Sequence, residues 1–253
     1  MSDIEEVPTI REVTIGDVFS TTVDVVFKNI LPLFALAGLF YLPTLIFQYY
    51  NQPDFADPLN IDYFASGMGG ILGLLFQFAL IAAMTSAVFA ALQGNKVGIG
   101  PSITQGLARM FPVLGVSILT GLAIMVGFVF LIIPGIIVSI MLCLSVPAVV
   151  VERGGVFAAM SRSSELTSGY RWKIFGLYLV ALVVLLIIAT IFGAVVSLVG
   201  FGLNGNMLAL LITGWVVDVV IGVFSAALTA VLYFKLRMAK EGLDLGQIAS
   251  VFE

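Results

Sequence analysis

Histidine is absent from this 253-residue chain, cysteine occurs once, and charged residues make up only 10% of it. Since histidine is the commonest general base and a frequent zinc ligand, its absence removes most metal-assisted hydrolysis. The single cysteine, Cys143, lies in an apolar run, so the chain has no intramolecular disulfide and no thiolate metal site. The formal net charge of −4 offers no basic surface for nucleic acid. We therefore predict no catalytic residue set, no metal site, no cofactor and no nucleic-acid partner.

Apolar residues are abundant instead, at 60% of the chain, with a mean hydropathy of +1.16. A soluble domain contains about half apolar residues and needs many more charges to cover its surface. The composition therefore predicts an all-α integral membrane protein and excludes a soluble enzyme or a secreted disulfide scaffold. The acidic start MSDIEEVPTIRE lacks the positive region that opens a signal peptide, so we expect it to be retained.

Six segments contain enough apolar residues to cross a bilayer, which requires about 20 residues in a helix. They are residues 31–50, 69–92, two within 111–151, 174–199 and 207–234. The stretch 111–151 contains no charge and is too long for one helix. Proline cannot continue a helix and glycine tolerates a reversal, so Pro134 and Gly135 predict a tight hairpin turn between the third and fourth spans.

The basic residues predict the orientation of these spans. All 11 fall in segments on one side: Arg11, Lys28, Lys96, Arg109, Arg153, Arg162, Arg171, Lys173, Lys235, Arg237 and Lys240. The opposite loops, 51–66, 132–134 and 200–206, contain none. Because basic loops stay cytoplasmic, we predict a multi-pass protein of the cytoplasmic (inner) membrane with both termini in the cytoplasm. The loop with Asp54, Asp57 and Asp62 is interpreted as solvated, because a calcium site needs more oxygen ligands at tighter spacing.

Amphipathic segments precede the first, third and fifth spans, at residues 15–30, 101–111 and 156–166. Each pattern predicts a helix lying flat at the cytoplasmic interface. The single membrane domain 1–253 then divides into a tail and interfacial helix (1–30), a first hairpin (31–92), an interfacial helix with a second hairpin (99–151), another with a third hairpin (154–236) and a cytoplasmic tail (237–253). Whether these units are true repeats stays open, because any amphipathic helix before a hairpin produces this pattern.

The stretch from Pro134 to Trp172 contains a Pro-Gly pair, a proline before a glutamate, and the pattern Arg-Ser-x-x-Leu-x-x-Gly-x-Arg-Trp. The residues are Pro134, Gly135, Pro147, Glu152, Arg162, Ser163, Leu166, Gly169, Arg171 and Trp172. This stretch resembles the multi-spanning membrane domain associated with some bacterial glycerophosphoryl diester phosphodiesterases, and related stand-alone six-helix proteins. The C-terminal LYFKLRMAKEGLDL is similar to that family's ending through Tyr233, Arg237, Glu241, Gly242 and Asp244.

The resemblance covers roughly the last 120 residues well and the first 130 only by topology. It implies a membrane domain whose role is usually described as anchoring. The enzymes that carry this domain have a separate phosphodiesterase barrel with histidine and carboxylate metal ligands. Because this chain contains no histidine, the resemblance implies no phosphodiesterase activity here.

Asp218 is the one ionisable residue deep inside a predicted span, and Gln77 is the other large polar residue at comparable depth. A charged side chain at the bilayer centre costs about 2.5–3.5 kcal/mol on insertion scales, so it needs a reason to be there. One interpretation is a carboxylate that handles protons or cations, with Gln77 as its partner. The favoured interpretation is a protonated or hydrogen-bonded aspartate that joins helices.

A second group of candidate residues lies at the predicted cytoplasmic surface: Glu152, Arg153, Arg162, Arg171, Trp172 and Lys173. Its cations suit the phosphate of anionic lipids or a surface for a partner. The alternative is structural: Glu152 and Arg162 tie the interfacial helix to the bundle, and Trp172 joins the aromatic belt. We expect Gly169 to end this helix in a left-handed conformation, which allows a sharp turn into the fifth span.

These residues favour a non-enzymatic scaffold or accessory subunit that organises lipid, a protein partner or copies of itself. The rival hypothesis is a small transporter or channel that uses Asp218 and Gln77. A lipid-modifying enzyme is the third class, and it lacks a nucleophile or metal partner beside Glu152 and Glu165.

Overall fold

The computed structural model describes residues 13–50, 63–202 and 207–241, and all regular structure within these ranges is α-helical. The helices are α1 (Ile15–Lys28), α2 (Ile30–Tyr50), α3 (Tyr63–Leu92), α4 (Ile99–Phe130), α5 (Ile132–Leu142), α6 (Ser145–Val151), α7 (Val156–Thr167), α8 (Arg171–Gly202) and α9 (Met207–Glu241). The first 12 residues, the acidic loop with Asp54, Asp57 and Asp62, and the last part of the C-terminal tail lie outside the described residues.

Six helical segments are long and apolar enough to cross a membrane: 30–50, 73–92, 99–130, 132–151, 171–198 and 208–241. This confirms the prediction of an all-α protein with six candidate spans. Their outer portions expose large apolar side chains, among them Val129 and Phe130 at the end of α4 and Leu186 in α8. Such exposure suits a chain whose outer surface faces hydrocarbon rather than water.

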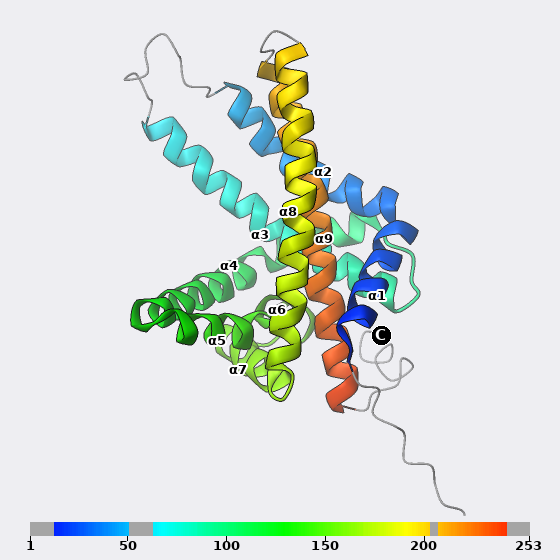
Figure 1. Ribbon diagram of the computed structural model, residues 1–253, viewed down its shortest axis with the longest axis vertical. Coiled ribbons are helices and arrows are strands. Elements are labelled where there is room, and N and C mark those ends of the chain that lie inside the picture. Colours follow the sequence, from blue (N-terminus) through cyan, green and yellow to red (C-terminus); the bar gives the residue numbers. More distant parts are fainter. Residues whose placement is uncertain (1–12, 51–62, 203–206, 242–253) are drawn as a thin grey trace, which may run out of the picture.

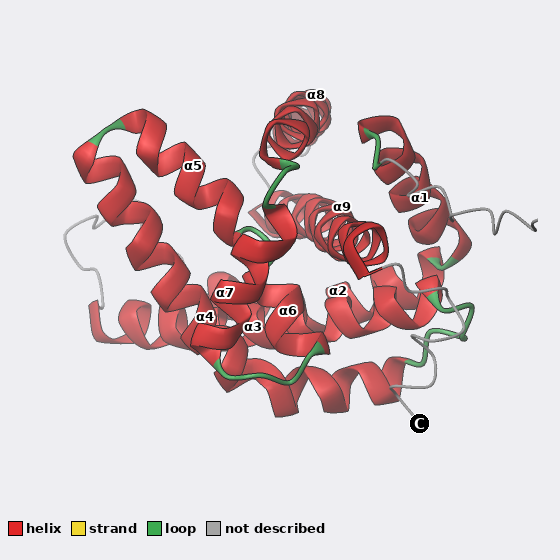
Figure 2. Ribbon diagram, turned by 90° about the horizontal axis from the view of Figure 1, so that it is seen from below, coloured by secondary structure: helices red, strands yellow, loops and turns green. Residues whose placement is uncertain are grey.

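The helices diverge from a shared core (Figure 1). Helices α8 and α9 run side by side along the long axis, whereas α4 and α5 form a pair that extends sideways from it (Figures 1 and 2). Helix α9 contacts α1, α2, α3 and α8. The largest fully buried side chains come from six helices and the start of α6: Val18, Leu33, Met84, Leu144, Leu166, Leu177 and Tyr233 are among them. The core therefore lies near the end of the molecule formed by α1, α6, α7, the start of α8 and the last turns of α9, which we call the basic end.

The interfacial helix predicted before the third span and that span form one continuous helix, α4, which contains Pro112. The reversal into α5 occurs at Leu131, whose extended backbone (φ −170°, ψ 160°) separates the two helices. It therefore precedes the predicted turn at Pro134 and Gly135. Pro134 instead occupies the first turn of α5, where a missing N–H breaks no helical bond. Gly135 lies against α4, because a Cβ there would come within 2.4 Å of the Phe128 ring.

The fourth candidate span is interrupted between α5 and α6, and a buried serine from α7 fills the gap. The Ser163 hydroxyl donates to the carbonyl of Met141 over 2.7 Å and accepts from the amide of Leu144 over 3.0 Å. Pro147, in the first turn of α6, has no amide hydrogen to continue the helical bonds of α5. One side chain thus satisfies two backbone groups at this interruption.

Helices α1 and α7 form as separate elements before α2 and α8. The apolar face of α1 is only partly covered by the rest of the protein. Val18 and Val26 are buried, whereas Phe27 is 62% exposed. An ion pair of 2.6 Å between Lys235 Nζ and an Asp17 carboxylate oxygen joins α1 to α9. Helix α9 continues to Glu241, so the first residues of the predicted tail are helical.

Candidate functional site

A network of ion pairs at the basic end joins α7 to α6 and α9. The Arg162 guanidinium donates from Nε to Glu152 Oε1 over 2.8 Å, and its Nη1 lies 3.3 Å from Glu165 Oε2. Arg162 also pairs with Glu241, whose second oxygen lies 2.9 Å from Nε of Arg237. We call these residues, together with Tyr233 and Lys240, the Arg162 clamp.

Two contacts extend the clamp along α9. The Tyr233 hydroxyl donates to Glu152 Oε1 over 2.5 Å from a fully buried position. The Lys240 ammonium donates to the backbone carbonyl of Glu165, at the end of α7. Burial lowers the pKa of Arg162, but the hydrogen bond and charge of Glu152 outweigh it and hold the pKa above its ordinary value. Arg162 is therefore a permanent cation, whose charge the surrounding carboxylates balance.

Residues from two sequence patterns, the 134–172 stretch and the C-terminal LYFKLRMAKEGLDL, meet in this clamp, although they come from distant parts of the sequence. Glu152 and Arg162 belong to the Pro134–Trp172 stretch, whereas Tyr233, Arg237 and Glu241 belong to the C-terminal pattern. The sequence identified these positions but not that they contact one another. Their convergence favours the structural interpretation of Glu152 and Arg162 over direct lipid binding by that pair.

Gly169 lies in the turn that redirects the chain from α7 into α8. Its φ is +82°, and the amide of Tyr170 donates to the carbonyl of Thr167 over 3.0 Å. Ser168 precedes it with φ −59° and ψ 131°, which is the geometry of a type II turn. A glycine at this position places α7 and α8 at a sharp angle without backbone strain.

The other residues predicted at the cytoplasmic surface do not form one site. Trp172 is 85% exposed, and its ring packs edge-on against Phe175 with centroids 6.2 Å apart. The Lys173 ammonium lies 5.7 Å from the centre of the Tyr170 ring. Arg171 lines a cavity of about 420 Å³ between α5 and α8, and its Nε is buried with no hydrogen-bond partner among the described residues. Arg153 lies elsewhere, in the loop between α6 and α7.

The structure brings Asp218 and Gln77 to one region of the bundle, together with a residue that the sequence analysis missed. The Tyr41 hydroxyl, on α2, interacts with the Gln77 side chain on α3 and lies within electrostatic range of Asp218 on α9. The Asp218 side chain is exposed at the protein surface, so it is not enclosed within the bundle. A tyrosine hydroxyl in the middle of an apolar span was the signal that could have identified this third member.

Two glycines bring α2 and α9 together around these polar groups. A Cβ at Gly38 would lie 3.1 Å from the Trp215 ring, and a Cβ at Gly222 would lie 2.8 Å from the Tyr41 hydroxyl. Each glycine thus accommodates an aromatic side chain of the opposite helix. The indole nitrogen of Trp215 is buried and has no hydrogen-bond partner among the described residues.

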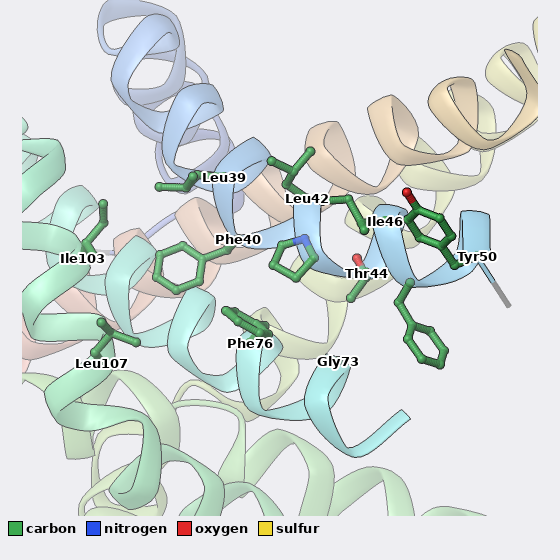
Figure 3. Close-up of a pocket in the computed structure, with 12 residues that line it drawn as sticks. Leu39, Phe40, Leu42, Thr44, Ile46, Tyr50, Gly73, Phe76, Ile103 and Leu107 are labelled. Atoms are coloured by element: carbon green, nitrogen blue, oxygen red, sulfur yellow. The ribbon is translucent and has the colours of Figure 1, made fainter. Parts of the chain in front are cut away.

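A groove of about 660 Å³ runs between α2 and α3 and reaches the start of α4 (Figure 3). Phe40 and Phe76 lie across it, and Ile103 and Leu107 close the α4 side. Its Thr44 hydroxyl donates to the backbone of its own helix over 2.6 Å. The groove presents no charged side chain, so it offers apolar contact but no group for acid–base chemistry.

The residues that the structure describes contain no cluster of three or more acidic or cysteine side chains placed to hold a metal ion. Fold and sites together define a polytopic all-α protein with an ionic clamp at one end and an intramembrane polar cluster. No family model matches the chain, and no similar curated protein or solved structure is found.

Proposed function

We propose that this chain is a non-enzymatic scaffold or accessory subunit of the cytoplasmic (inner) membrane, where it organises lipid or a partner protein at its basic end. The Arg162 clamp carries this proposal. It engages the carboxylates of this end in internal bonds and fixes α7 against α6 and α9. A fixed helix at the membrane surface suits a binding platform. The membrane domain that residues 134–172 resemble supports the same kind of role.

In this proposal the basic end faces the cytoplasm, and both termini lie on that side. The distribution of all 11 basic residues supports this orientation. The spans pair as three hairpins, α2 with α3, α4 with α5–α6, and α8 with α9, and contacts within each pair support this arrangement. Helices α1 and α7 and the first turns of α4 lie in the headgroup layer.

Exposed aromatic residues beside cations supply the proposed contact surface. Phe157, at the start of α7, is 74% exposed and Trp172, at the start of α8, is 85% exposed. Arg171 and Lys173 flank Trp172 in the sequence. Aromatic rings next to basic side chains are typical of the boundary between headgroups and hydrocarbon. Membrane lipids and one protein partner or a second copy are the proposed ligands.

Native mass spectrometry of the protein, extracted together with its surrounding lipid, tests this role. We expect a defined partner, a stoichiometric oligomer or retained lipid. A Phe157→Ser/Trp172→Ser variant should lose that component while remaining folded, whereas Asp218→Asn should keep it. A lone monomer without lipid would overturn the scaffold proposal, as would full retention by the double variant.

A small transporter or channel is the second candidate function. The observation that favours it is the meeting of Tyr41, Gln77 and Asp218 from three helices, with the Asp218 side chain exposed. A carboxylate at such depth is costly unless it binds a partner or a permeating ion. Proton or cation flux into proteoliposomes separates the two functions. Flux that Asp218→Asn abolishes would establish transport, and equal background leakage for both proteins would exclude it for those ions.

A further inference from the structure

A polar cavity, about 380 Å³ in volume, lies at the basic end between the end of α3, the first half of α4 and the end of α6. Its polar lining includes Gln93, Gln105, Arg109 and Arg153. Phe89 and Val151 form part of the apolar floor, and both are buried. We call this cavity the two-arginine pocket. No carboxylate is among its lining residues.

The two arginines differ from those in the Arg162 clamp. Arg162 and Arg237 both pair with carboxylates. Arg109 and Arg153 make no ion pair or side-chain hydrogen bond with the residues that the structure describes. Two cations that share a cavity without a counter-charge are a source of repulsion, which an anion bound between them would remove. Arginine forks match the geometry of phosphate oxygens, and glutamine amides add neutral donors.

The backbone provides a second, independent observation. Arg153 has φ +54°, and it is the one non-glycine residue with positive φ in the described ranges. Gly154 and Gly155 follow it directly, yet the arginine adopts the left-handed conformation rather than either glycine. Such a conformation is unfavourable for a side chain with Cβ and is retained where the position of that side chain matters. Here it places Arg153 among the lining residues of the pocket, directly after the clamp residue Glu152.

We propose that the two-arginine pocket binds the phosphate of a ligand, with Arg109 and Arg153 as its charged contacts and Gln93 and Gln105 as neutral donors. The proposal rests on the membrane role proposed above and names its ligand class. Two sources supply this chemistry: the headgroup of an anionic phospholipid, or a small water-soluble phosphate compound. The apolar floor and the position beside the headgroup layer suit the lipid.

Lipid retention by the purified full-length protein tests the pocket. The protein in neutral detergent is mixed with phosphatidic acid, phosphatidylglycerol or phosphatidylcholine, and bound lipid is counted by native mass spectrometry. Arg109→Gln/Arg153→Gln should weaken binding of the anionic lipids by about tenfold or more, because each lost charge-assisted bond contributes substantially. Lys28→Gln is the matched control, since it removes a cation of the basic end that pairs with Asp24 outside the pocket. It should leave binding unchanged.

Arg153→Gly is a second variant that separates binding from folding. Glycine relieves the left-handed strain, so the variant should unfold at the same or a higher temperature and yet lose the phosphate ligand. Competition by inorganic phosphate or glycerol 3-phosphate assigns the source. Binding of these anions that depends on both arginines supports a soluble ligand, and their failure to displace the lipid supports a headgroup.

Equal binding of anionic lipid by the wild type and the double glutamine variant, with no arginine-dependent phosphate binding, would overturn the proposal. The pocket is judged by this arginine-dependent signal alone. The scaffold proposal is judged by what is extracted from the membrane with the Phe157→Ser/Trp172→Ser variant. Each can fail without the other.

Discussion

The hydroxyl of Tyr233 donates to Oε1 of Glu152 over 2.5 Å, although 81 residues separate them in the chain. Tyr233 is fully buried in α9, and its ring lies 5.6 Å from that of Phe89 on α3. Glu152 ends α6 and also accepts from Arg162 on α7. One carboxylate therefore links the core of the bundle to the helix at its surface.

The Glu152→Gln substitution tests this link. It removes the charged acceptor of a partly buried arginine and weakens the bond from Tyr233. We expect the free energy of unfolding to fall by about 1–3 kcal/mol. Asp24→Asn is the control, because its partner Lys28 is 76% exposed on its side chain and such a surface pair contributes about 0.5 kcal/mol or less. Equilibrium unfolding in detergent measures the free energy of unfolding of both variants. Equal losses in the two variants would contradict a stabilising role of Glu152 between α6, α7 and α9.

The Ser163 bridge yields a second prediction. Ser163→Ala leaves the Leu144 amide and the Met141 carbonyl without the partner that the hydroxyl provides, at a cost of about 1–3 kcal/mol. Hydrogen exchange should accelerate locally at the junction of α5 and α6. Ser161→Ala, at an exposed position of the same helix, should change neither quantity. Unchanged protection at Leu144 in the Ser163→Ala variant would refute the bridging role.

The turn at Gly169 yields a third prediction. Alanine at φ +82° is strained, although no atom lies within 4 Å of the added Cβ, so Gly169→Ala should destabilise the protein by about 1 kcal/mol or more. Gly169→Asn should recover part of the loss, because asparagine tolerates the left-handed region. Gly16→Ala, in the open first turns of α1, should instead be neutral or stabilising. Thermal unfolding that places both alanine variants on the same side of the wild type would contradict this account.

The crossing of α3 and α4 at Gly106 yields a fourth prediction. A Cβ there would lie 2.7 Å from the Ala79 carbonyl oxygen and 2.7 Å from the Ala83 Cβ. Because backbone cannot rotate away, Gly106→Ala should destabilise the protein by about 1–3 kcal/mol. Ala83→Gly should restore part of that stability in the double variant. Gly121→Ala, with nothing within 4 Å, is the control on the same helix.

The crossing also sets the positions of the two cavities. Residues on one flank of Gly106, such as Leu107, line the apolar groove, whereas Gln105 and Arg109 line the two-arginine pocket. A shift of α4 by the Gly106→Ala clash should therefore reduce anionic lipid binding as well as stability, and Ala83→Gly should restore both together. Native mass spectrometry of the single and double variants measures the lipid. If Gly106→Ala lost stability but bound anionic lipid normally, the position of α4 at this crossing would not control the two-arginine pocket.

The apolar run lengths determined most of the helical architecture. A span such as residues 31–50 must satisfy its backbone hydrogen bonds internally in hydrocarbon, so length and hydropathy suffice to predict a helix. Gly169 was also readable, since a glycine between an amphipathic helix and a span signals a reversal. The turn was predicted at Pro134 but occurs at Leu131. Proline fits the first turn of a helix as well as it ends one, so its position did not fix where the chain reverses.

The candidate sites were only partly readable. Asp218 and Gln77 were identified because polar side chains are conspicuous in apolar segments. Tyr41, inside the span 31–50, was missed because its ring suits an apolar segment and only its hydroxyl is polar. Arg109 and Arg153 each looked like a surface cation. Only the fold shows that they line one cavity.

The sequence by itself thus determined an all-helical chain with six apolar segments long enough to cross a membrane, because hydropathy acts locally along the chain. The tertiary structure alone decided which polar groups meet. Glu152 joins Arg162 and Tyr233, and Tyr41 joins Gln77, through helix crossings set by small residues such as Gly38, Gly106 and Gly222. Contacts of this kind depend on packing between distant segments, and no local pattern in the sequence specifies that packing.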